Sequence, residues 1–304
     1  MTYRVKESPL FFEVGGDHCF GVLTHPERPN GLGVMIIQGG DTVNVSMQRN
    51  RLAVRMARQL AERGHLVLRF DYHGLGESTG QIGELKLTEP FGEDALAAAE
   101  VLRKAGADRI VMVGACFSAR TALAAGPEIP DLAAVVASTP PIAAYGRSDA
   151  VAERMARDQN LSDYASVAFR AKTVKALFDP TRRGLYLKFA RSKFRQIARR
   201  VTGGEKGESR WWVSPEFLAQ LENLARRKVP VLLSYGDSDP LLREFDRARD
   251  GRLGRIISMS EGTTQVQRDL PGVIHGFPSI PGQEAFLTST IDWIERATQV
   301  VDSR

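Results

Sequence analysis

Residues 109–125 constrain the fold more than any other part of the chain. Residues 109–113 (Arg-Ile-Val-Met-Val) predict a buried strand, and the alanine-rich residues 119–125 predict a helix. Between them, residues 114–118 read Gly-Ala-Cys-Phe-Ser. Small side chains two positions on either side of Cys116 suit a tight turn, because the backbone folds back on itself there. The segment therefore predicts a cysteine held at a sharp strand-to-helix turn.

The rest of the chain alternates between strand and helix patterns. A hairpin of two edge strands is predicted at 8–14 and 19–24, joined by the turn residues 15–17. Further strands are predicted at 33–38, 65–70, 132–137, 229–235 and 266–270, and helices at 49–63, 91–104 and 283–301. This alternation predicts an α/β fold with a mostly parallel sheet and helices on both faces.

Two further groups with catalytic chemistry follow predicted strands. Asp237 and Asp239 come after residues 229–235, and His275 comes after residues 266–270. A lone cysteine after a buried strand is usually a small core residue, but here a carboxylate and an imidazole follow in chain order. Asp237 is an alternative to Asp239 as the acid. Because Asp239-Pro240 looks like the start of a helix, we favour Asp239.

The order Cys116, Asp239, His275 resembles the catalytic order of the α/β-hydrolase superfamily, whose sharp turn is called the nucleophile elbow. That family usually carries Ser where this chain has Cys116. The resemblance implies that Cys116 is the nucleophile, His275 the general base and Asp239 the residue that orients it. It also implies an oxyanion hole made by the backbone N–H groups of Phe117 and Gly40.

Other parts of the chain extend the resemblance to nearly its whole length. Residues 71–78 look like the loop after the family's fourth strand, and we expect Asp71 and His73 there to be structural. Residues 38–41 stand where the family has its oxyanion loop, with Gln38 in place of a frequent His. More narrowly, the chain is similar to hydrolases associated with exosortase systems, in which a carboxylate precedes a stretch like Arg243-Glu244-Phe245.

The resemblance implies an acyl-transfer enzyme that works through a thioester acyl-enzyme and needs no cofactor. Such an enzyme could hydrolyse an ester or thioester, or pass the acyl group to an alcohol or amine. The alternative is a non-catalytic protein of the same fold that binds a ligand or partner. The intact set of Cys116, Asp239 and His275 argues against that alternative.

The interval between residues 137 and 229 is too long for a simple crossover. Apolar residues at helical spacing within it predict helices, and the resemblance implies a cap inserted at this point. We therefore expect residues 1–140 and 215–304 to form the hydrolase core and residues 141–214 to form an inserted helical cap. Residues 147–210 hold 16 Lys and Arg against 7 Asp and Glu. This excess predicts a solvated helix face, attraction of an anionic carrier such as coenzyme A or an acyl carrier protein, or, third, contact with anionic lipid or nucleic acid. No recognised nucleic-acid motif accompanies it.

The cysteines, histidines and apolar runs of the chain argue against a disulfide, a metal site and a membrane span. Cys19 and Cys116 lie on different predicted elements, which argues against a disulfide, and we expect Cys19 to be inert. The five histidines are scattered, so no metal site is predicted. No apolar run is long enough to span a bilayer, and Met1–Lys6 lacks the apolar core of a signal peptide. From these features we expect a cytoplasmic protein.

Overall fold

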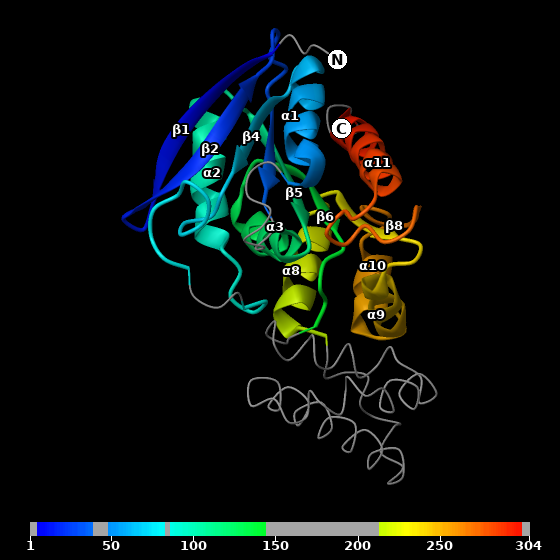
Figure 1. Ribbon diagram of the computed structural model, residues 1–304. Coiled ribbons are helices and arrows are strands. Elements are labelled where there is room, and N and C mark those ends of the chain that lie inside the picture. The colour runs from blue at the N-terminus through cyan, green and yellow to red at the C-terminus, as the bar shows by residue number, and fades with distance from the viewer. Residues whose placement is uncertain (1–4, 39–47, 83–85, 144–212, 300–304) are drawn as a thin grey trace, which may run out of the picture. The chain divides into compact units, whose positions relative to one another are not determined.

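The computed structural model describes residues 5–38, 48–82, 86–143 and 213–299. In this part of the chain, eight strands form one sheet in the order β1-β2-β4-β3-β5-β6-β7-β8 (Figure 1). The strands are β1 (Lys6–Val14), β2 (Asp17–His25), β3 (Leu32–Ile37), β4 (Leu66–Phe70), β5 (Arg109–Ala115), β6 (Leu132–Ser138), β7 (Val231–Gly236) and β8 (Thr264–Leu270). The mostly parallel α/β sheet predicted from the sequence is confirmed.

The first two strands form the predicted antiparallel hairpin. Gly15 and Gly16 both have positive φ, which a tight hairpin turn needs and which glycine adopts without strain. The prediction of two edge strands is wrong for β2, because β2 also pairs in antiparallel fashion with β4. From β4 to β8, all neighbouring strands are parallel.

The helices alternate with the strands as the sequence predicts. The predicted helices are α1 (Leu52–Glu62), α2 (Gly92–Lys104), α3 (Phe117–Ala125) and the terminal helix α11 (Ile280–Gln299). A short 3₁₀ turn at Arg49–Arg51 precedes α1, and a second one at Gly126–Glu128 follows α3. The sequence did not predict bounds for α8 (Pro215–Arg226), α9 (Pro240–Ala248) and α10 (Arg252–Met259). Of these three helices, α9 begins at the helix start expected at Asp239-Pro240.

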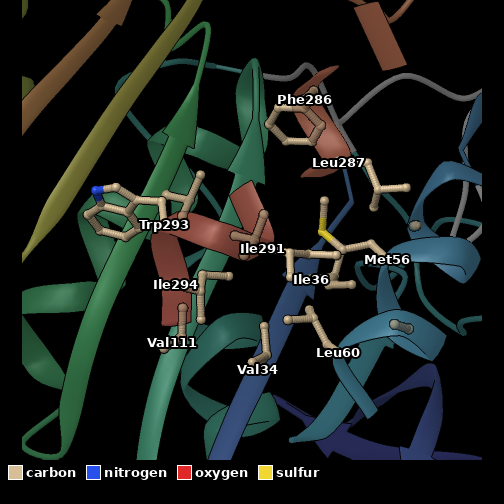
Figure 2. Close-up of a cluster of buried hydrophobic side chains, with 14 of the residues drawn as sticks. Val34, Ile36, Met56, Leu60, Val111, Phe286, Leu287, Ile291, Trp293 and Ile294 are labelled. Carbon is tan, nitrogen blue, oxygen red and sulfur yellow. The ribbon is translucent and has the colours of Figure 1, made fainter. Parts of the chain in front are cut away.

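One face of the sheet packs against α1 and α11. Val34 and Ile36 of β3 and Val111 of β5 meet Met56 and Leu60 of α1 and the α11 side chains Phe286, Leu287, Ile291, Trp293 and Ile294 (Figure 2). All these side chains are at most 4% exposed. Burying side chains of this size contributes about 1.5–3 kcal/mol each, so this layer fixes the central strands that lead to the elbow.

The opposite face packs against α2 and α3. Gly33 of β3 points toward α2, where an added Cβ would lie 2.7 Å from the Cβ of Ala107 and 3.4 Å from Leu102. The close approach of strand and helix therefore requires glycine at this position.

The two parts of the predicted core join in one sheet. β6, from the first part, pairs with β7, from the second. Apart from its ends at 141–143 and 213–214, the predicted cap lies outside the described residues, so its boundaries and its helical character stay predictions.

Candidate active site

Cys116 stands at the strained turn that the sequence predicts between β5 and α3. Its φ of 57° and ψ of −117° are unusual for a residue with a side chain. Gly114 permits the turn, because an added Cβ there would lie 2.3 Å from the carbonyl oxygen of Ser118. The Ser118 hydroxyl closes the turn by accepting from the N–H of Ala115 at 2.8 Å and donating to its carbonyl at 2.9 Å.

The elbow is tied to the neighbouring strand and opens a helix. The backbone N–H of Cys116 donates to the carbonyl of Ser138, at the end of β6, at 2.9 Å. Cys116 is also the residue that precedes the first turn of α3. The positive end of a helix dipole favours a thiolate over a thiol at this position. Cys116 as a residue is partly exposed.

The structure brings His275 to Cys116. The distance between His275 Nε2 and Cys116 Sγ is 3.0 Å, within hydrogen-bond reach. His275 lies in the loop after β8, which rests against the end of β7: a Cβ added to Gly236 would lie 2.1 Å from the carbonyl oxygen of Gly272. Two residues 159 positions apart in the chain thus form one thiol–imidazole pair.

Asp239 holds the loop that carries His275. One carboxylate oxygen accepts from the backbone N–H of His275 at 2.9 Å, and the other accepts from the N–H of Leu241 at 3.0 Å. Asp239 is fully buried and caps α9, which has Pro240 in its first turn. These two bonds join the carboxylate to the backbone, so Asp239 fixes where the loop places the imidazole.

The alternative acid, Asp237, has a different environment. Its Oδ1 accepts from the hydroxyl of Ser238 at 2.8 Å and from the N–H of Gly272 at 3.0 Å, and the residue is exposed. Asp237 therefore supports the base of the same loop, three residues from the imidazole, whereas Asp239 contacts His275 itself.

Of the two predicted oxyanion donors, only Phe117 belongs to the described residues. Phe117 is the first residue of α3, and the first N–H groups of a helix have no partner within it. Gly40 lies outside the described residues. Gln38 ends the segment before it. This side chain is 2% exposed, and among the described residues neither its amide oxygen nor its amide nitrogen has a hydrogen-bond partner.

A second cluster with the same three residue types lies around Cys19. The Sγ of Cys19 is 3.7 Å from Oδ2 of Asp94, and both carboxylate oxygens of Asp94 are 3.0 Å from Nδ1 of His73. Asp94 also accepts from the backbone N–H of His73 at 2.9 Å. Burial, followed by the charge of Asp94, raises the pKa of Cys19 to about 12, so Cys19 is a thiol at neutral pH.

Sequence reasoning missed Arg120, the largest of the fully buried side chains. Its guanidinium donates to the carbonyl of Pro141 and to the hydroxyl of Ser214, both at 3.0 Å. The N–H of Ser214 also donates to the carbonyl of Ile142 at 2.8 Å. Burial lowers the pKa of Arg120 to about 10, so it stays charged at neutral pH. Arg120 lies in an alanine-rich helix, and nothing in the local sequence indicates that its side chain is buried and bonds to Pro141 and Ser214.

Comparison with known proteins identifies the family. A family model described as the alpha/beta hydrolase fold matches residues 34–252. This chain belongs to the α/β-hydrolase family. None of the curated proteins matches the sequence. The narrower resemblance to the exosortase-associated hydrolases stays a prediction.

Solved structures share the fold of this α/β-hydrolase at low sequence identity. A proline iminopeptidase of Mycobacterium smegmatis has a TM-score of 0.61 and 16% identity, over 97% of this chain and 100% of its own. An esterase of Pyrococcus furiosus has a TM-score of 0.60 and 15% identity, over 96% and 91%. The thioesterase domain of a curacin biosynthetic pathway has a TM-score of 0.52 and 19% identity, over 95% and 99%.

Among the described residues, no helix combines the length and apolarity needed to cross a membrane.

Proposed function

We propose that this protein is an acyl-transfer enzyme in which Cys116 is the nucleophile, His275 the general base and Asp239 the supporting acid. The observation that carries the proposal is the 3.0 Å contact between Cys116 Sγ and His275 Nε2 at a strained helix-opening turn. A backbone strained in this way is commonly maintained at functional sites. The family contains hydrolases, and the similar structures include an esterase and a thioesterase.

The first half-reaction forms a thioester. His275 Nε2 takes the proton from Cys116, and the sulfur attacks the carbonyl carbon of the substrate. The carbonyl oxygen becomes an anion, for which the N–H of Phe117 is one donor and an N–H of Gly40 the proposed second. When the tetrahedral intermediate collapses, the bond to the leaving group breaks and His275 gives its proton to that group.

The second half-reaction frees the enzyme. His275 accepts a proton from water, an alcohol or an amine, and the resulting nucleophile attacks the thioester carbonyl. The carbon–sulfur bond breaks, and the thiolate of Cys116 recovers its proton from His275. Throughout both halves, Asp239 holds the His275 backbone through the 2.9 Å bond and stabilises the imidazolium by its charge.

Sulfur bears on the choice of substrate and acceptor. A thioester acyl-enzyme is close in energy to a thioester donor, so it forms readily and keeps the acyl group activated for a second nucleophile. Hydrolysis and transfer to an alcohol or amine are both compatible with this site. A donor carried on coenzyme A or an acyl carrier protein would also suit the positive charge of residues 147–210.

The test is turnover of a matched pair of small substrates, one oxyester and one thioester with the same acyl group. We expect the parent and Cys19→Ala to turn over at least one of them, with a burst of acyl-enzyme detectable by intact mass. Cys116→Ala should show neither burst nor turnover. A parent protein that gains no acyl mass from either substrate would favour the non-catalytic binding protein.

A further inference from the structure

Two serine hydroxyls lie on neighbouring strands at the carboxyl end of the sheet, beside the strand that leads to Cys116. Ser138 ends β6 and pairs in register with Ala115 of β5 on one side and with Ser234 of β7 on the other. Both serines are 0% exposed. Neither hydroxyl has a hydrogen-bond partner within the part of the chain that the structure describes. Buried groups left unpaired lose their hydration without compensation, and in native proteins ordered water commonly satisfies them.

The two hydroxyls point to the same face of the sheet. Along parallel strands, every second side chain lies on one face. Val136 of β6 and Leu232 of β7, two positions before Ser138 and Ser234, belong to the buried layer that packs against α1 and α11. The hydroxyls therefore continue that face toward the end of the sheet where the active site lies.

The loop that carries His275 covers the same face. Gly236, two positions after Ser234, touches this loop so closely that a Cβ there would lie 2.1 Å from the carbonyl oxygen of Gly272 and 3.1 Å from the N of Ile274. Ile274 and Phe277 are members of the same buried layer. Because β6 separates β5 from β7, the loop must pass the end of β6 for His275 to reach Cys116.

We propose that Ser138 and Ser234 bind a buried water molecule between the end of the sheet and the loop that carries His275. The water accepts from one hydroxyl, bonds to the other and bonds to polar groups of loop 271–277, which gives it the two to four partners that a buried water needs. It thereby positions the imidazole against Cys116. The inference rests on the proposed function, because it assigns Ser138 and Ser234 as positioning residues for His275.

A crystal structure at high resolution tests the water directly. We expect density for one water within about 2.7–3.2 Å of both serine hydroxyl oxygens. The density should be absent in the double variant Ser138→Ala/Ser234→Ala. Hydroxyls that bond directly to protein groups, with no water between them, would overturn the proposal.

The rate of Cys116 alkylation by iodoacetamide, followed from pH 5 to 10, tests the positioning role. In the double alanine variant we expect this rate to fall about three- to tenfold at neutral pH, the effect of losing one hydrogen bond. The pH dependence of the alkylation rate should shift as well. Ser234→Thr, which keeps the hydroxyl, should retain the parent profile.

Thr264→Val is the matched control. Thr264 begins β8 and also has a buried hydroxyl without a partner among the described residues, but it pairs with Val231, at the start of β7. It should leave the alkylation profile unchanged. An equal shift in the control, or an unchanged profile in the double alanine variant, would overturn the positioning role.

The two proposals fail in different ways. If Cys116→Ala keeps full turnover, the proposed function is wrong even where the water is seen. If turnover depends on Cys116 but no water bridges the serines, only the present inference is wrong.

Discussion

The surroundings of Cys116 and Cys19 contain the same three residue types in different order. At the first, the imidazole of His275 lies 3.0 Å from the sulfur, and the carboxylate of Asp239 accepts from the backbone N–H of His275. At the second, the carboxylate of Asp94 stands between the sulfur of Cys19 and the imidazole of His73. A base next to sulfur promotes the thiolate, whereas a negative charge next to sulfur opposes it.

Exposure and backbone separate the two cysteines further. Cys19 is fully buried in the regular strand β2, whereas Cys116 is partly exposed at a strained turn that opens a helix. Residue types alone therefore do not distinguish the two cysteines. We expect the order of the three groups, the exposure of the cysteine and its place at a helix terminus to determine its reactivity.

The largest difference is expected when each sulfur is removed. Cys116→Ala should lower kcat/KM by at least about 10³-fold, because it removes the proposed nucleophile. Cys19→Ala should leave kcat/KM within about twofold of the parent, at some cost in stability from the small cavity. Steady-state kinetics with circular dichroism to check folding decides this. Comparable losses in the two variants would remove the distinction between the sites.

The second largest difference is expected between removal of the His275 imidazole and removal of the His73 imidazole. His275→Ala removes the proposed base and should lower kcat/KM by about 10³-fold or more. His73→Ala removes a hydrogen bond to buried Asp94 and should instead lower the free energy of unfolding by about 1–3 kcal/mol with little change in activity. Urea unfolding gives the free energy of unfolding of each variant, and steady-state kinetics gives kcat/KM of each. Loss of turnover in folded His73→Ala would show that the second cluster takes part in catalysis.

A smaller difference in kcat/KM is expected between variants of the two carboxylates, Asp239 and Asp94, and both variants should also lose stability. Asp239→Asn should lower kcat/KM by about 10²-fold or more, but by less than His275→Ala. It should also destabilise the fold, because Asp239 accepts from two backbone N–H groups and an amide has only one acceptor oxygen. Asp94→Asn should affect stability alone.

Asp237→Asn serves as the control for the acid role, since Asp237 contacts Gly272 and not His275. We expect it to keep most of the parent's kcat/KM. If Asp237→Asn is inactive while Asp239→Asn matches the parent, the acid role belongs to Asp237.

The smallest expected effect is on alkaline stability. The pKa of Cys19 is raised by burial from an ordinary value near 9 to about 12, so above pH 9 the unfolded chain loses the proton while the folded chain keeps it. Its stabilising contribution is complete below pH 9 and is lost between pH 9 and 12, at about 1.4 kcal/mol per pH unit. Cys19→Ala should therefore lose less stability than the parent between pH 8 and 10.5. Parallel curves of unfolding free energy against pH would contradict this.

Local pattern made much of the Cys116 site predictable. The elbow pentapeptide, the aspartate before a proline and the histidine after the last strand each follow a strand, and parallel strands bring their carboxyl ends to one edge. The sequence did not predict that Asp239 would bond to the His275 backbone, because that contact depends on how two loops pack.

The Cys19 cluster could not be predicted in the same way. Cys19, His73 and Asp94 lie in a hairpin strand, a loop and the first turn of a helix, and no spacing links them. The contacts of Arg120 were not predictable for a similar reason: its partners, Pro141 and Ser214, lie far apart in the sequence. Burial of a charged side chain is a tertiary property without a local signature.

Peptide mapping of the acylated protein tests the central claim most directly. The parent, with both cysteines present, is exposed briefly to a small activated thioester, quenched in acid and digested, and the acyl mass is assigned to peptides. We expect acyl mass on the peptide that contains Cys116, none on the peptide that contains Cys19, and loss of the Cys116 adduct in His275→Ala. Acylation of Cys19 at a comparable rate, or of Cys116 at the same rate without His275, would contradict it.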